Sequence, residues 1–109
     1  MRQAEVHYKG EKAGMLTQHD DGSFSFRYED IWMADPGRPS ISLTLPRSRQ
    51  EYHAPHLFAF FYNMLPEGRN REVVCSMLRI DRDDYFSLMM VTARYDVVGA
   101  VTIKKLEKE

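Results

Sequence analysis

The sequence predicts a small α+β domain in which an antiparallel sheet packs with three short helices. Residues 4–8 and 24–28 alternate apolar and polar side chains, which is the period of half-buried strands. Between residues 57 and 65, apolar side chains recur at helical spacing instead. An apolar run at residues 99–104 then resumes a strand pattern. Strands followed by helices and one last strand indicate an α+β fold.

The first three strands are expected to form an antiparallel meander. Residues 4–8 make the first strand and residues 13–19 the second, with a polar turn between them. Asp21-Gly22 then favours a tight hairpin, because this pair tolerates the positive φ that such turns need. Residues 24–28 form the third strand. The apolar side chains that share one face of the first and third strands are Ala4, Val6, Tyr8, Phe24, Phe26 and Tyr28.

The alternating pattern breaks after the third strand. Residues 31–33 are apolar and predict a short helical turn, and the Asp-Pro-Gly sequence at residues 35–37 predicts a loop. Residues 41–45 alternate again, and Pro46 ends this run, which suits an edge strand. Residues 47–53 are expected to be a polar connection.

The stretch LFAFFYNMLPEGRNR at residues 57–71 is expected to organise the core. Pro55 suits the first turn of a helix and Pro66 ends it, so the first helix covers about residues 55–65. Burying its six apolar side chains would contribute about 9–18 kcal/mol as an upper bound. These side chains are Leu57, Phe58, Phe60, Phe61, Met64 and Leu65.

Two further helices and one strand complete the prediction. The second helix covers about residues 71–79 after a cap at Asn70, and the third follows a cap at Asp81. The last strand, after a loop at residues 94–97, should return to the sheet, because a lone strand leaves its backbone unpaired. The predicted inner faces are Val74, Met77 and Leu78 in the second helix, and Phe86, Met89 and Met90 in the third.

Length, charge and cysteine content limit the possible functions. The 109 residues suit a single domain, residues 1–109, and the net charge of −1 makes direct nucleic-acid binding unexpected. No apolar run is long enough to span a bilayer, and the N-terminus has no signal-peptide pattern. Cys75 is the single cysteine, so no intrachain disulfide can form. We therefore expect a cytoplasmic protein without a membrane partner.

The sequence offers no motif for catalysis, a cofactor or a metal. His53 and His56 are three residues apart, but no third ligand accompanies them at a suitable spacing. The Asp-Arg-Asp-Asp run at residues 81–84 lacks the histidine, the asparagine and the glycine-rich loop of a kinase. No serine lies in a nucleophile motif. The chain is therefore not expected to be an enzyme.

Basic residues gather around the turn after the first helix. Arg69, Arg71 and Arg79 could form a patch with Arg47 and Arg49 that suits a phosphate or an acidic protein surface. An ordinary solvated face explains the same arginines as well.

Four phrases of the sequence form an ordered set: GSFSFRY at residues 22–28, PSISLTLP at 39–46, FFYNMLPEG at 60–68 and DVVGAVTI at 96–103. In this order they resemble the N-terminal subdomain of HipA-like serine/threonine kinase toxins, over nearly the whole chain. In full-length members the kinase core follows the last of these phrases, whereas the present sequence stops at Glu109. The chain thus resembles the HipS-like small subunits of three-component HipBST toxin–antitoxin systems.

This resemblance implies a non-catalytic antitoxin that binds and inhibits a separately encoded, HipT-like serine/threonine kinase. It also implies a ternary complex with a HipB-like helix-turn-helix protein that binds the operator DNA. We expect a stiff turn to carry the kinase contact, with a semi-exposed tryptophan as a second anchor. The residues concerned are Pro66, Glu67, Gly68, Arg69, Asn70 and Arg71 in the turn, and Trp32. Packing of this tryptophan under the sheet edge is an equally good explanation of its presence.

A structural role is the alternative to inhibition. The domain could complete or scaffold a HipA-like kinase, and its assembly with the helix-turn-helix partner, without inhibiting the kinase. It could also be an excised N-terminal piece of a longer kinase. Growth rescue on co-expression with the kinase would favour inhibition, whereas enhanced toxicity would favour completion.

Overall fold

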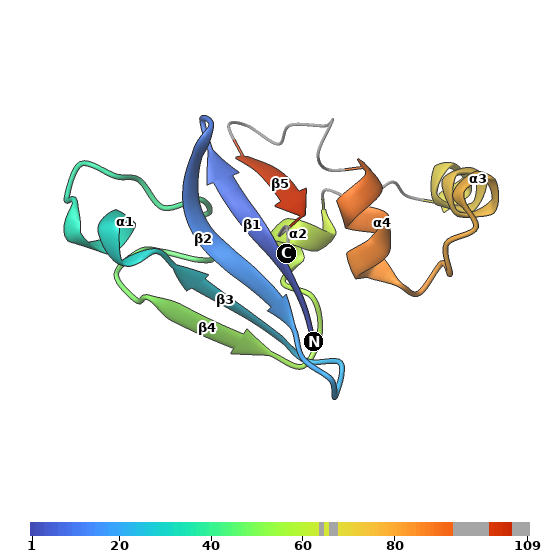
Figure 1. The fold of residues 1–109 in the computed structure, drawn as a ribbon, viewed down its shortest axis with the longest axis horizontal. Helices are drawn as coiled ribbons and strands as arrows, with labels where there is room; N and C mark the ends of the chain where they lie inside the picture. Colours follow the sequence, from blue (N-terminus) through green and yellow to red (C-terminus); the bar gives the residue numbers. More distant parts are fainter. Residues whose placement is uncertain (64, 66–67, 93–100, 106–109) are drawn as a thin grey trace.

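The computed structural model describes residues 1–63, 65, 68–92 and 101–105. Its strands form one antiparallel sheet in the order β4-β3-β2-β1-β5 (Figure 1). They are β1 (Arg2–Tyr8), β2 (Glu11–Gln18), β3 (Phe24–Tyr28), β4 (Glu51–Ala54) and β5 (Val101–Lys105). The predicted meander and the return of the last strand beside β1 are confirmed. The start of that predicted strand, and the predicted loop at residues 94–97, lie outside the described residues.

The register of the strands places apolar side chains on one face of the sheet. Val6 of β1 lies opposite Gly14 of β2 and Ile103 of β5, and Leu16 of β2 lies opposite Phe26 of β3. Because successive side chains of a strand point to opposite faces, the other face is largely polar. The polar face includes Glu5, His7, Thr17, Ser25 and Arg27.

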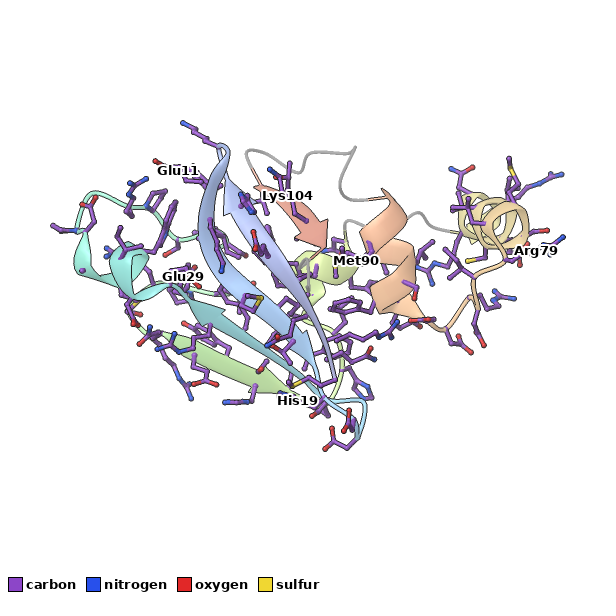
Figure 2. All side chains as sticks on the ribbon, in the orientation of Figure 1. Glu11, His19, Glu29, Arg79, Met90 and Lys104 are labelled. Atoms are coloured by element: carbon purple, nitrogen blue, oxygen red, sulfur yellow. The ribbon has the colours of Figure 1, made fainter. Side chains whose placement is uncertain are left out.

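Helices α2 (Ala59–Tyr62) and α4 (Tyr85–Thr92) complete the core. The ring centre of Phe61 in α2 lies 5.8 Å from the ring centre of Phe26 in β3. Phe86 and Met89 of α4 are buried. Figure 2 shows Met90 on the side of α4 that faces the sheet. The other two helices in the described part of the chain lie at opposite ends of the molecule: α1 (Asp30–Ala34), the predicted helical turn, and α3 (Gly68–Leu78) (Figure 1).

The first long helix is much shorter than predicted. Helix α2 begins only at Ala59, because the backbone of Phe58 is extended, with ψ 141°. Pro55 therefore precedes the helix and does not occupy its first turn. The predicted apolar cluster still enters the core, since Leu57, Phe61 and Leu65 are buried and Phe58 and Phe60 pack against them. Met64 lies outside the described residues.

Residues 41–45 form a loop and not the predicted edge strand. The hydroxyl of Tyr28, fully buried in β3, occupies backbone groups that a strand would need. It accepts a hydrogen bond from the Ile41 amide at 3.0 Å and donates one to the Leu45 carbonyl. Leu43, between these anchored positions, is 98% exposed. The edge strand is β4, which lies in the predicted polar connection and pairs with β3.

Replacing Tyr28 by phenylalanine is expected to lower the free energy of unfolding by about 1–3 kcal/mol, because a buried amide and a buried carbonyl lose their partner. Urea denaturation followed by the fluorescence of the single tryptophan measures this change. Tyr52→Phe is the matched control and should cost under about 1 kcal/mol, since water can replace its surface hydroxyl. Equal costs for the two variants would contradict the anchoring role of Tyr28.

The stability that Tyr28 provides is expected to depend on pH. Burial raises the pKa of Tyr28, so the folded state holds the phenolic proton more tightly than the unfolded state does. Its contribution is therefore fully present below about pH 10, the ordinary tyrosine pKa, and is lost as the pH rises through the folded-state value. A smaller alkaline loss of stability in Tyr28→Phe than in the wild type would confirm this assignment.

Helix α4 is capped by Asp84 and not by Asp81 as predicted. The Asp84 carboxylate accepts hydrogen bonds from the amide and the hydroxyl of Ser87, at 3.2 and 2.7 Å, whereas Asp81 only stabilises the preceding turn. Arg2 of β1 also binds Asp84, with 2.7 Å between Nη2 and Oδ1. Burial alone would raise the pKa of Asp84, but the hydrogen bonds from Arg2 and Ser87 lower it overall. This contact ties α4 to the sheet.

Candidate partner-binding site

Helix α3 lies beyond α4, on the side away from the sheet (Figure 1). Figure 2 shows Arg79, directly after α3, at the outer end of the molecule. Within the helix only Cys75 is buried. The helix ends in a Schellman-type turn, in which Arg79 has φ 56° and the Ile80 amide donates to the Cys75 carbonyl at 2.9 Å. Helix α3 therefore extends from the domain and does not cover the sheet.

Apolar side chains are exposed on α3. Val73 and Met77, one helical turn apart, are 47% and 77% exposed, and Leu78 is 51% exposed. The prediction that Met77 and Leu78 face the core is therefore wrong. The helix turns Cys75 inward, and this rotation directs Val73 and Met77 to solvent. Exposed apolar side chains grouped on one element are typical of protein contact sites.

Three of the predicted contact residues occupy the first turn of α3. Gly68, Arg69 and Asn70 are all exposed. The helix begins at Gly68, where φ is 54°, so Asn70 lies inside the helix and is not the predicted cap. Residues three, four and seven apart share one side of a helix. Arg69 and Asn70 therefore lie on the same side of α3 as Val73 and Met77. We call Arg69, Asn70, Val73 and Met77 the α3 outer face.

The other predicted residues of the turn behave differently. Pro66 and Glu67 lie outside the described residues. Arg71 is half-buried and faces inward, where its Nη2 donates to the hydroxyl of Tyr62 at 3.2 Å. Its guanidinium carbon lies 5.2 Å from the ring centre of Tyr62 and 5.6 Å from that of Tyr85. The hydrogen bond with Tyr62 raises the pKa of Arg71, a side chain that is charged in any case.

Trp32 is not the semi-exposed anchor that was predicted. It is only 2% exposed, and its indole N–H donates to the Pro39 carbonyl at 2.8 Å. The guanidinium of Arg38 lies 4.9 Å from the indole centre, and the ring centre of Tyr8 lies 5.9 Å from it in an edge-to-face arrangement. Trp32 also belongs to α1, at the opposite end of the molecule from α3 (Figure 1). The burial of Trp32 agrees with the alternative explanation, packing under the sheet edge.

The predicted basic patch does not form as one surface. Arg47 donates to the carbonyls of Trp32, Met33 and Asp35, at 3.1, 2.8 and 2.8 Å, and so closes the C-terminal end of α1. Arg47 therefore lies at the α1 end, whereas Arg69 lies on α3. The two halves of the proposed patch are at opposite ends of the molecule (Figure 1).

One hollow among the described residues is small for a ligand site. A shallow hollow of about 170 Å³ lies beside His56, Asp83 and Tyr85, below the volume of about 300–1,000 Å³ typical of ligand pockets. No three His, Cys, Asp or Glu side chains among these residues gather closely enough for a metal ion. No helix in the same part of the chain has the length and apolar composition needed to cross a bilayer.

Two kinds of residue at this site were not predicted from the sequence. The exposure of Val73 and Met77 was not predicted, because their spacing of four places them on one side of the helix but only the burial of Cys75 identifies that side as the outer one. Tyr62 and Tyr85, which hold Arg71, had no such signal, because the three residues come from three different helices.

Comparisons with known proteins concern nearly the whole chain. Residues 4–104 match the family model described as HipA N-terminal domain. A solved structure described as the N-terminal domain of HipA toxin superposes with a TM-score of 0.73 at 28% sequence identity. This match covers 100% of the present chain and 96% of that chain.

The curated relatives differ in how much longer they are than this chain. A protein of Haemophilus influenzae named "Uncharacterized protein" is 29% identical over 105 residues, which is 96% of this chain and 93% of that protein. Two Sinorhizobium fredii proteins named "Putative kinase Y4mE" and "Putative kinase Y4dM" are 27% and 28% identical over 109 residues. The matches cover only 26% of each of these two proteins.

Proposed function

Because the chain belongs to the HipA N-terminal domain family, we propose that it binds a HipA-like serine/threonine kinase and inhibits it as a non-catalytic antitoxin. The kinase would be a separately encoded, HipT-like protein. A HipB-like helix-turn-helix protein would join the two in a ternary complex in the cytoplasm, and that partner, not this chain, would contact the DNA.

The relatives support both parts of this proposal. Two proteins with kinase names contain a segment similar to this chain and about three times as much further sequence, so a kinase core is a natural neighbour for this domain. The Haemophilus influenzae relative has almost the length of this chain, which supports a domain that works as a separate protein.

The observation that carries the site assignment is the exposure of Val73 and Met77 on a helix directed away from the sheet. Apolar side chains of this kind gain free energy when a partner removes them from water. The α3 outer face offers them beside the charged Arg69 and the polar Asn70, the mixture of apolar centre and polar rim that protein interfaces have. A helix seated beside the nucleotide cleft of the kinase would oppose the closure that phosphoryl transfer requires. A contact through Glu67 stays a prediction.

The double variant Val73→Asp/Met77→Asp is expected to weaken kinase binding by roughly 100-fold, which corresponds to two contacts of somewhat more than 1 kcal/mol each. Isothermal titration calorimetry of the purified chain with a HipT-like kinase from the same genome measures the affinity. Kinase activity in the same mixture should recover as binding is lost.

Leu43→Asp is the matched control, because Leu43 is 98% exposed but lies in the loop near α1. It should leave both binding and inhibition unchanged. If the folded double variant binds as tightly as the wild type, the α3 outer face is not the contact. If the wild type neither binds nor slows the kinase, the antitoxin proposal itself is wrong.

A second function is favoured by the two long relatives, in which this domain is joined to the remaining chain. In that case the domain would complete or scaffold a HipA-like kinase, and its assembly with the helix-turn-helix partner, without inhibiting it. Co-expression separates the two proposals. Rescue of growth supports the antitoxin, whereas unchanged or increased toxicity together with tight binding supports completion.

A further inference from the structure

The contacts of Arg71 place one side chain at the junction of three helices. Tyr62 is the last residue of α2, Arg71 lies within the first turns of α3, and Tyr85 is the first residue of α4. The guanidinium donates to the Tyr62 hydroxyl and lies within 6 Å of both ring centres. The two rings also meet edge to face, with 5.3 Å between their centres. We call Arg71, Tyr62 and Tyr85 the tyrosine clasp.

We propose that Arg71 is a positioning residue, which fixes the direction of α3 relative to α2 and α4 and thereby presents the α3 outer face in one orientation. The effect on kinase binding rests on the proposed function, whereas the effect on the helix direction does not.

Two observations support this role. Helix α3 extends away from the sheet, and its packing against the core is limited to the buried Cys75 and the partly buried Val74, so this packing constrains its direction weakly. A planar guanidinium can donate a directed hydrogen bond to one ring substituent while it lies against two aromatic rings, and lysine cannot reproduce this combination. The Arg71 side chain lies against Tyr62 and Tyr85, on the side of α3 opposite Val73 and Met77, so a role in orienting the helix is separable from a contact at the α3 outer face.

The direction of α3 can be measured on the isolated chain. Spin labels at Ser76→Cys on α3 and His53→Cys on β4, in a Cys75→Ala background, report the distance distribution by double electron–electron resonance. We expect a narrow distribution with Arg71, at least a twofold broadening in Arg71→Gln, and an intermediate width in Arg71→Lys. Arg69→Gln is the matched control, because Arg69 lies on the outer face of the same helix, and it should keep the narrow distribution.

An unchanged width in folded Arg71→Gln would overturn the proposal. Tyr62→Phe keeps the ring and removes only the hydroxyl, so it tests the clasp even if Arg71→Gln does not fold. It should broaden the distribution measurably, and a width equal to the wild type would likewise contradict the assignment. Fluorescence of the buried Trp32, far from α3, reports whether each variant is folded.

Binding kinetics separate positioning from contact. If only a fraction of the chains hold α3 in the binding orientation, the apparent affinity falls in proportion to that fraction. Arg71→Gln should therefore lower the association rate about tenfold and leave the dissociation rate nearly unchanged, whereas Met77→Ala should mainly raise the dissociation rate. A change confined to the dissociation rate of Arg71→Gln would make Arg71 a contact residue. Absence of wild-type binding would refute the proposed function and leave the distance result intact.

Discussion

Replacing Gly14 by alanine is expected to lower the free energy of unfolding by about 3 kcal/mol or more. A Cβ at this position would lie 2.6 Å from the Arg27 carbonyl oxygen and 2.7 Å from Cζ of Phe26. Both neighbours belong to β3, which pairs with β2 across this point. Relief would require a shift of the backbone between two central strands, because the nearest atom belongs to the main chain. Chemical denaturation measures the loss of stability. A larger insoluble fraction on expression should accompany it.

Gly37→Ala is the control for this substitution. Its nearest neighbour is a carboxylate oxygen of Asp35 at 3.3 Å, at the end of an exposed side chain that can move. The free energy of unfolding should change by less than about 1 kcal/mol. If Gly14→Ala lowers the free energy of unfolding as little as Gly37→Ala does, β2 and β3 can shift apart at little cost. The close packing of Phe26 against Gly14 is then not required for the sheet.

Replacing Trp32 by alanine is expected to destabilise the domain by about 3–5 kcal/mol, the usual cost of removing a large aromatic side chain from a core. The substitution removes the indole hydrogen bond to Pro39 and the contacts with Tyr8 and Arg38. Circular dichroism during thermal unfolding measures the change, since the variant has no tryptophan. Ile31→Ala is the control, because Ile31 is the neighbouring residue in α1 and is 72% exposed.

This experiment also decides between the two interpretations of Trp32. If Trp32 belongs to the core, Trp32→Ala should lower the unfolding temperature, and the folded variant should keep the wild-type kinase affinity. If Trp32 is a partner anchor, the variant should keep its unfolding temperature and lose kinase affinity. A stable Trp32→Ala protein that no longer binds the kinase would restore the interpretation that the burial of Trp32 contradicts.

The β1–β3 meander could be predicted from the sequence because its signals are local, whereas the edge strand β4 was missed. Alternation in residues 4–8 and 24–28 and the turn at Asp21-Gly22 each identify a strand or hairpin without reference to the rest of the chain. Residues 41–45 show the same alternation but form a loop. The hydroxyl of Tyr28 binds the Ile41 amide and the Leu45 carbonyl, and nothing near these residues in the sequence reveals that contact.

The candidate site was predicted less well for a related reason. Apolar residues occur around much of the circumference of α3, at Val73, Val74, Met77 and Leu78, so periodicity alone could not choose the buried side. The buried side of α3 is the one that carries Cys75 and Arg71, and Arg71 is held there by tyrosines of two other helices. Residues Gly68, Arg69 and Asn70, which were predicted to belong to the turn before the helix, form its first turn and are exposed.

The position of α3 has a consequence for how such domains diverge. Substitutions on the α3 outer face remove few buried contacts and therefore cost little in folding, and under the proposed function they would change recognition of the kinase. Under the proposed function, related pairs of such a domain and its kinase would become mutually exclusive when a single helix on a shared scaffold changes. Transplanting the exposed residues of α3 from one member to another should exchange the cognate toxin while the rest of the protein stays the same.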